Sequence, residues 1–422
     1  MHHAPHRPRV LLLTTPATYR AEAFLAAAQR LGVEVVLAVD LPPDLAAQWQ
    51  TPLGIDFTDL EAATAAIVAY ARRHPLSAIL PVDDAGVELA ASACAALGLP
   101  FNAPAAASAA RDKYRMRQLL QAGNVPIPRF ALHTTAEDPR VVAAQTRFPC
   151  VVKPLRLSGS RGVIRADDAA QFVAAVERLT RLLNSVEPGA HPKAYLVEDF
   201  VPGCEVALEG LLDAGELHVL ALFDKPDPLD GPFFEETIYV TPSRLPAATQ
   251  AAIAGCAAAA ARALGLRHGP LHAELRVNAR GPWLIEVAGR SIGGLCSQTL
   301  RFGTDASLEE VILRQACGLP LPPLTLAGEA RGVMMIPIPE AGILKGVHGL
   351  DAARRVPGIS AVEITARCNY PLVPLPEGDS YLGFIFARAA TPAEAEAALR
   401  EAHAQLRFEI RPNITLLGPG AG

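Results

Sequence analysis

Apolar positions in the first hundred residues form two kinds of segment that follow one another. Residues 10–14 are a continuous apolar run, which is typical of a strand buried on both faces of a sheet. Alanine-rich stretches between such runs have the composition of helices, and two of them end at Gly32 and Gly98, as helices often do. The predicted strands are residues 10–14, 33–39 and 78–82, and the predicted helices are residues 21–31 and 88–97. This alternation predicts a parallel sheet with helices on both faces.

The pattern changes at residues 125–128, where two prolines force their predecessors into extended conformations and mark a boundary. A short charged helix is predicted before it, at residues 112–120. The elements predicted after it are a small α+β lobe over 148–200 with a helix at 169–183, a hairpin over 203–224, a helix over 249–265, a second hairpin over 270–290, and strands over 330–412. The last helix begins after Thr391, with a capping box and a proline at its first position. The fold class is therefore multidomain, α/β followed by α+β.

The composition indicates a folded chain and excludes some classes of binding partner. With 422 residues, the chain has room for about three domains at roughly 150 residues each. Lys and Arg number 38 against 43 Asp and Glu, so the surface has no basic excess of the kind that nucleic acid requires. No apolar stretch reaches the roughly 18 residues needed to span a bilayer, and the N-terminus has no signal-peptide pattern. Seven scattered cysteines without CxxC spacing predict neither a disulfide framework nor a structural zinc site. We expect a cytoplasmic protein without nucleic-acid or membrane partners.

The second hairpin contains the clearest chemical signal. Alternation places His272 and Glu274 on one face of its first strand, together with Arg276. On its second strand, the same rule groups Leu284, Glu286, Ala288 and Arg290. If the loop is residues 278–282, so that Val277 faces Trp283, then Glu274 lies directly opposite Glu286.

Two opposed carboxylates repel each other unless a cation lies between them. Their oxygen atoms suit a hard divalent ion such as Mg²⁺. The alternative is that both glutamates are solvated on an exposed hairpin. The hairpin by itself leaves these two interpretations open.

Cationic side chains recur outside this hairpin. Lys153 ends an apolar strand, where a charge needs a partner. A Gly/Ser-rich loop follows it, whose backbone N–H groups are able to close on an anion such as phosphate. Taken alone, such a loop is weak evidence, and an ordinary hairpin turn is the alternative. The loop residues in question are Ser158, Gly159, Ser160 and Gly162. Lys113 and Lys225 are further candidates, each with a solvated surface lysine as the alternative.

The strand over residues 195–206 ends in acidic residues and a turn. Its backbone at Phe200 and Val201, with the side chain of Glu198, is suited to an adenine edge. Glu205 is suited to ribose hydroxyl groups. An ordinary acidic strand end is the alternative.

These stretches, in this order, resemble an ATP-grasp enzyme over nearly the whole chain; no single motif is specific, but the ordered set is. The matching pieces are residues 112–113, 152–154 with the Gly-rich loop, 198–205, and the Glu274/Glu286 pair ending in Arg290. Within that superfamily, residues 223–237, 269–274 and 286–290 most resemble carboxylate–amine ligases typified by bacterial L-amino acid (dipeptide) ligases. The resemblance implies an ATP-grasp fold with an N-terminal α/β domain (1–108), an ATP-grasp domain (109–325) and a C-terminal α+β domain (326–422). Residues 148–200 are then a small lid lobe that closes over ATP.

The resemblance also implies a reaction and a set of roles. A substrate carboxylate attacks the γ-phosphoryl group of Mg·ATP, and an amine then attacks the acyl phosphate to give an amide, ADP and phosphate. The implied ATP ligands are Lys113, Lys153, Lys225, the loop 158–162, Glu198, Phe200, Val201 and Glu205, and the implied ligands of one or two Mg²⁺ or Mn²⁺ ions are Glu274 and Glu286. Arg290 would hold the substrate carboxylate or acyl phosphate. His272 would lie near the reacting groups, or be structural. The expected partners are small carboxylates and amines such as amino acids, and a second copy of the chain in a homodimer.

One residue departs from the family pattern. Many ATP-grasp enzymes have a metal-ligating Asn two residues after the second glutamate, where this chain has Ala288. Ala288 is the one feature that supports a non-catalytic nucleotide-binding protein as an alternative. An ATP-grasp carboxylase or formyl-transfer enzyme that uses bicarbonate or formate is a second alternative that stays open.

Overall fold

The computed structural model describes residues 7–48, 53–187 and 189–412. By their internal contacts these residues divide into two units, each with its own core. The first unit comprises Met1–Pro128, Glu205–Phe223 and Ser243–Gly328, and the second comprises Arg129–Cys204, Asp224–Pro242 and Glu329–Gly422. The chain therefore passes several times between the units, which we describe separately.

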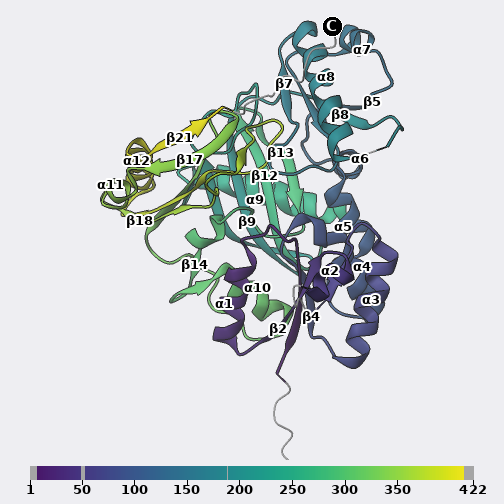
Figure 1. Cartoon of the computed structure of the whole chain (residues 1–422), viewed down its shortest axis with the longest axis vertical. Helices are drawn as coiled ribbons and strands as arrows, with labels where there is room; N and C mark the ends of the chain where they lie inside the picture. The colour runs from purple at the N-terminus through teal and green to yellow at the C-terminus, as the bar shows by residue number, and fades with distance from the viewer. Residues whose placement is uncertain (1–6, 49–52, 188, 413–422) are drawn as a thin grey trace, which may run out of the picture. The chain divides into compact units, whose positions relative to one another are not determined.

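The first unit begins with the predicted parallel sheet (Figure 1). Its strand order is β3-β2-β1-β4, and β1 pairs in parallel with both β2 and β4. The elements are β1 (Arg9–Thr14), α1 (Ala21–Leu31), β2 (Glu34–Asp40), α2 (Pro43–Gln48), β3 (Leu53–Ile55), α3 (Leu60–Arg73), β4 (Ala78–Pro81), the 3₁₀ turn η1 (Asp84–Gly86) and α4 (Val87–Leu97). Helices α1 and α4 end where predicted, because Gly32 (φ 67°) and Gly98 (φ 68°) adopt the left-handed conformation that closes a helix.

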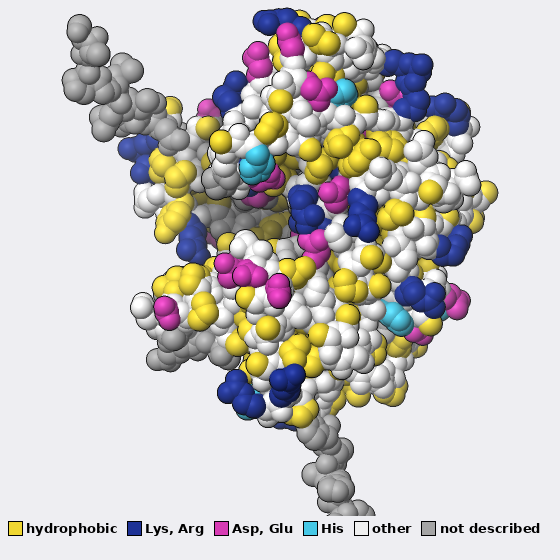
Figure 2. Space-filling model, turned by 90° about the vertical axis from the view of Figure 1, so that its right-hand side faces the viewer, with side chains coloured by type: hydrophobic (Ala, Val, Ile, Leu, Met, Phe, Trp, Pro, Cys, Tyr) yellow, Lys and Arg dark blue, Asp and Glu magenta, His cyan; other side chains and the backbone are white. Residues whose placement is uncertain are grey.

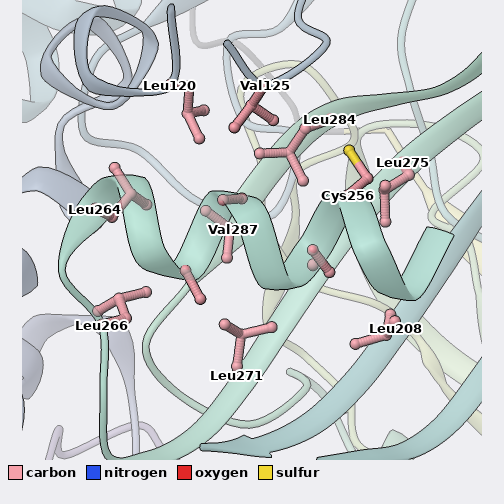
Figure 3. Packing of buried hydrophobic residues seen from close by; sticks show 14 of the residues in the cluster. Leu120, Val125, Leu208, Cys256, Leu264, Leu266, Leu271, Leu275, Leu284 and Val287 are labelled. Carbon is pink, nitrogen blue, oxygen red and sulfur yellow. The ribbon is translucent and has the colours of Figure 1, made fainter. Parts of the chain in front are cut away.

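Two hairpins and a long helix make the rest of this unit. They are β9 (Cys204–Asp213) with β10 (Glu216–Lys225), β12 (Gly269–Asn278) with β13 (Gly281–Ala288), and α9 (Ala247–Leu264); the remaining elements are α5 (Pro104–Arg111), α6 (Lys113–Ala122), η2 (Cys296–Thr299), β14 (Arg301–Phe302), β15 (Ala306–Ser307) and α10 (Leu308–Ala316). The predicted hairpin over 203–224 is present, and it turns at Ala214 and Gly215. Figure 3 shows α9 packed against the hairpin strands through buried side chains such as Leu264, Leu271 and Leu284. This core fixes one face of β12 and β13, so polar side chains on the other face have a rigid support.

The second unit begins with a four-stranded antiparallel sheet in the order β5-β8-β6-β7. Its elements are β5 (Phe130–Thr134), α7 (Pro139–Gln145), β6 (Cys150–Pro154), β7 (Ile164–Ala166), α8 (Ala169–Val186) and β8 (Ala194–Asp199). The predicted order of strand, turn, strand, helix and strand over 148–200 is confirmed. Strand β5, which pairs with β8, was not among the predicted elements.

The remainder of the second unit is also antiparallel. Strands β11, β16, β20 and β18 are neighbours in that order, and α12 packs on β16 and β20 through side chains such as Leu399. The elements are β11 (Ile238–Thr241), β16 (Ala330–Ile336), β17 (Gly342–His348), α11 (Leu350–Arg354), β18 (Ile359–Ile364), β19 (Pro371–Leu372), β20 (Gly383–Ala389), α12 (Pro392–Ala404) and β21 (Arg407–Arg411). The predicted capping box at Thr391 and Glu394 is confirmed.

The described residues were also compared with the requirements of a membrane-spanning helix and of a charged surface patch. None of their helices combines the length and the apolar composition needed to cross a membrane. On the face drawn in Figure 2, Lys and Arg side chains lie interspersed with Asp and Glu side chains, in keeping with the formal net charge of −5.

Candidate functional site

Glu274 and Glu286 are direct partners in the register of β12 and β13, as predicted. The predicted loop, however, is wrong. Asn278 pairs with Gly281 and Val277 pairs with Pro282, so the turn has only two residues and Val277 does not face Trp283. A β-bulge then shifts the register by one residue, since Leu275 pairs with Leu284 but Glu274 pairs with Glu286. The shorter turn and the bulge compensate each other, which is why the predicted carboxylate pair is correct.

The bulge also changes which side chains share a face. Leu284 and Val287 both lie in the core under α9, although they are three residues apart. The prediction that Leu284 shares a face with Glu286 is therefore wrong. On β12 the alternation holds, because Leu271, Ala273 and Leu275 are in the core while His272, Glu274 and Arg276 are on the opposite face, as expected.

Helix α6 brings two cationic side chains to Glu286. Lys113 is buried, and its Nζ lies 3.3 Å from Oε1 of Glu286, so it is not a solvated surface lysine. One turn later, the buried Arg117 donates from Nη2 to the carbonyl of Ile285 at 2.6 Å. Asp112 caps the helix by accepting from the N–H of Arg115. Arg117 was not predicted, although its spacing of four from Lys113 places both on one helix face.

His272 lies between two carboxylates. Its Nδ1 is 2.7 Å from Oε1 of Glu209, and its Nε2 is 3.3 Å from Oε1 of Glu274. Burial acts to lower the pKa of His272, but the hydrogen bonds and charges of these two carboxylates outweigh it and raise the pKa to about 9. Glu209 is fully buried, and this burial raises its pKa. Glu209 was not predicted; its signal was an acidic residue inside the otherwise apolar run 206–212 of strand β9.

Arg290 lies two residues beyond the end of β13. Its Nη2 donates to Oδ2 of Asp84 at 2.8 Å, and its Nη1 donates to the carbonyl of Ser291 at 2.9 Å. Asp84 also pairs through Oδ1 with Arg111, at 3.0 Å. Burial acts to lower the pKa of Arg290, but Asp84 and, more weakly, Glu286 raise it, so the guanidinium stays charged. Asp84, from the parallel-sheet region, was not predicted.

Glu205 lies close to the predicted metal ligands. One of its carboxylate oxygens is within 4.8 Å of a carboxylate oxygen of Glu274. Its Oε2 is 3.8 Å from Nε of the buried Arg276. The first unit thus brings together six of the predicted site residues, which are Lys113, Glu205, His272, Glu274, Glu286 and Arg290.

In the second unit, two of the predicted nucleotide residues are buried lysines that each pair with a glutamate. Lys153 Nζ lies 2.7 Å from Oε2 of Glu198, and both side chains are buried, so the partner that Lys153 requires is itself a predicted site residue. Because Glu198 is buried, the alternative of an ordinary, solvated acidic strand end does not apply to it. Lys225 is buried as well, bonded to Glu236, with its Nζ 4.9 Å from the centre of the Tyr239 ring.

Some backbone N–H groups of the predicted nucleotide residues already donate hydrogen bonds to protein carbonyl groups. The N–H of Phe200 donates to the carbonyl of Pro149, and the N–H of Gly162 donates to that of Pro376 at 2.8 Å. Arg161, in the same loop, donates to the carbonyl of Glu377 at 2.7 Å. These two N–H groups therefore point to protein carbonyls, and the remaining loop and strand-end assignments, including Val201, stay predictions. The loop has left-handed conformations at Gly159, Ser160 and Gly162.

Three regions of the chain match known families. Residues 25–101 match the ATP-grasp N-terminal domain, residues 146–299 the ATP-grasp domain, and residues 334–411 the L-amino acid ligase C-terminal domain 2. The chain is 28% identical over 284 residues to alanine–anticapsin ligase of Bacillus subtilis, an alignment that covers 59% of each protein. It is 32% identical over 185 residues to D-alanine–D-alanine ligase of Aromatoleum aromaticum, which covers 43% of this chain and 57% of that ligase. Both alignments span less than two thirds of these relatives.

Among solved structures, the L-amino acid ligase from Bacillus licheniformis is similar to this chain, with a TM-score of 0.79 and 25% sequence identity. That similarity covers 96% of this chain and 99% of the ligase.

Proposed function

The chain belongs to the ATP-grasp ligases, and from that premise we propose that it joins a carboxylate to an amine at the expense of ATP. One carboxylate oxygen attacks the γ-phosphorus of ATP, the bond to the bridging oxygen of ADP breaks, and an acyl phosphate forms. The amine nitrogen then attacks the acyl carbon, loses a proton, and displaces phosphate. The products are an amide, ADP and phosphate.

The opposition of Glu274 and Glu286 carries this proposal. Two carboxylates directly across a strand pair destabilise the hairpin unless cations compensate them, and Lys113 contacts Glu286. Their side chains are 21% and 34% exposed, so a hydrated ion has access. The donor set, all carboxylate oxygens, fits Mg²⁺. When bound, Mg²⁺ would neutralise charge on the phosphate oxygens during transfer.

We assign the buried lysines to the phosphates of ATP. Lys153 and Lys225 are each paired with a carboxylate, Glu198 and Glu236 respectively, and both lysine side chains are shielded from water. Phosphoryl transfer needs mainly charge that is already in position, and these pairs provide it. Glu198 and Glu205 keep their proposed roles toward adenine and ribose.

Arg290 is the proposed ligand of the substrate carboxylate and of the acyl phosphate. Asp84 orients its planar fork and leaves further N–H donors for an oxyanion. His272, fixed between Glu209 and Glu274, is proposed to hold its charge close to the metal ligands. We further propose that both substrates are amino acids and that the product is a dipeptide.

A matrix of paired amino acids, each with Mg·ATP, tests this function by phosphate release and product mass. We expect phosphate release that depends on both substrates, with a product whose mass is the sum of the two minus water. Bicarbonate and formate are separate arms of the matrix. Phosphate release with either of these and with no amino acid pair would contradict the proposal, as would nucleotide binding without phosphate release in every arm.

A further inference from the structure

Arg117 is an unusual residue for the interior of a protein. It is 1% exposed, although a guanidinium loses much hydration free energy on burial unless its donors are paired. Its Nη2 donates to the carbonyl oxygen of Ile285 at 2.6 Å. This contact joins α6 to β13 across 168 residues of sequence. We therefore ask what the hydrogen bond between Arg117 and Ile285 does for the nearby residues of β13.

Ile285 is the extra residue of the β-bulge in β13. The two-residue turn, continued without a bulge, would set Glu274 opposite Ile285 and Glu286 opposite Ala273. Ala273 faces the core under α9, so this register would turn Glu286 into an apolar environment and away from Glu274. A slip of one residue reverses the faces of a strand. The bulge is therefore what allows the two glutamates to meet.

A bulged residue cannot use its backbone groups fully in the strand ladder, and a buried carbonyl needs a donor from elsewhere. Arg117 supplies that donor to Ile285. From the preceding turn of the same helix, Lys113 contacts the carboxylate of Glu286, the next residue along β13. Helix α6 thus holds both the backbone before Glu286 and its side chain.

We propose that Arg117 is a positioning residue for the metal pair: by bonding the bulge carbonyl, it keeps Glu286 on the same face as Glu274. The inference rests on the proposed function, because it takes these two glutamates as the metal ligands. Arg117 itself touches neither metal nor substrate. Residues that orient metal ligands typically contribute a factor of about 10 to 100 in metal affinity.

Mn²⁺ affinity, measured by electron paramagnetic resonance with a non-hydrolysable ATP analogue, tests this role. In Arg117→Met, which keeps an unbranched side chain but has no donor, we expect affinity to fall about 10- to 100-fold. Arg117→Lys restores a single donor and should recover part of the loss. The matched control is Arg115→Met, since Arg115 is exposed on the same helix and Asp112 bonds only its main-chain N–H. This control should bind Mn²⁺ as the wild type does.

Thermal unfolding of each variant separates positioning from general stability. A lower midpoint with unchanged Mn²⁺ affinity in folded Arg117→Met would overturn the inference. If Arg117→Met does not fold, Arg117→Gln takes its place, because its shorter side chain does not reach the carbonyl; wild-type Mn²⁺ affinity in that variant would equally overturn it. If the wild type itself binds no Mn²⁺ with the analogue, the proposed function fails, and the inference with it.

Discussion

Buried charges in this protein are arranged in short chains of alternating sign. Examples in the first unit are Arg111–Asp84–Arg290, Glu209–His272–Glu274 and Lys113–Glu286. Removing one member of a buried pair leaves its partner uncompensated, at a cost of about 3–5 kcal/mol. Each chain therefore fixes the position of a candidate catalytic group before any substrate arrives.

Arg290→Ala tests the assignment of the acyl-phosphate ligand. The variant should bind Mg·ATP nearly as tightly as the wild type but turn over about 10²- to 10³-fold more slowly, because the lost contact strengthens in the transition state. Arg290→Lys should recover little, since an ammonium offers no planar fork. Titration calorimetry for ATP and measurement of kcat check both expectations.

Arg280→Ala is the matched control for this substitution, because Arg280 is an exposed arginine in the turn of the same hairpin. It should leave ATP affinity and kcat unchanged. Loss of ATP binding in Arg290→Ala, with wild-type turnover at saturating ATP, would make Arg290 a nucleotide ligand instead.

The cysteines give a second prediction at this scale. Cys204 and Cys368 are exposed, whereas burial raises the pKa of Cys94 and Cys150 to about 12 and that of Cys256 to about 11. Thiolate is the reactive form, so at pH 8 a disulfide reagent such as Ellman's should label the two exposed thiols first. All seven should react in guanidinium chloride. Fast labelling of Cys94, Cys150 or Cys256 in the native protein would contradict the described burial.

Individual elements were predictable to different degrees. Helices α1 and α12 carry their own end signals, Gly32 in one and the Thr391 capping box in the other, so local sequence sufficed. Strand β5 lacks such signals, because it alternates weakly and follows two prolines. The rule of strict alternation assumes that no extra residue is inserted into a strand, so applying it to β13 missed the bulge. The Glu274/Glu286 pair was therefore predicted correctly from a wrong turn.

The residues that contact the site residues could not be predicted from local sequence patterns. Asp84 meets Arg290 across 206 residues of sequence, and Arg117 meets Ile285 across 168. Periodicity specifies which face a side chain occupies but not which distant element covers that face. The residue types needed for chemistry were visible in the sequence, while the residues that hold them in place became visible only in the structure.

The loop over residues 158–162 allows a test at the scale of one element. If it is a lid over ATP, trypsin cleavage after Arg161 should slow several-fold with a non-hydrolysable Mg·ATP analogue. Cleavage after Arg280, in an exposed turn, is the control and should keep its rate. Equal cleavage after Arg161 with and without the analogue would show that the loop is not a lid. Mass spectrometry of the fragments distinguishes the two sites.

At the scale of the whole molecule, the chain folds into units that are discontinuous in sequence. Each predicted domain, 1–108, 109–325 and 326–422, is one continuous stretch of sequence. The two units, in contrast, are defined by which residues pack together, and each contains several separate stretches. The two divisions describe different properties, and the domain bounds stay a prediction.

Nucleotide and metal should stabilise this molecule together. A ligand present at 100 times its dissociation constant adds about 2.7 kcal/mol to the free energy of unfolding. We therefore expect a non-hydrolysable ATP analogue to raise the thermal midpoint by several degrees with Mg²⁺, and by much less with EDTA. In Glu286→Gln the Mg²⁺-dependent part of the shift should be lost. An equal shift with and without metal would contradict the assignment of Glu274 and Glu286.

In the proposed reaction a carboxylate becomes an acyl phosphate before the amine attacks, and isotope transfer reports on this step. An accepted amino acid pair is incubated with Mg·ATP, with ¹⁸O in both carboxylate oxygens of the acyl donor, and the released phosphate is analysed by mass spectrometry. We expect one ¹⁸O atom in each phosphate, because the attacking carboxylate oxygen leaves with phosphorus when the amide forms. Phosphate without ¹⁸O, accompanied by normal amide formation, would contradict the proposed reaction.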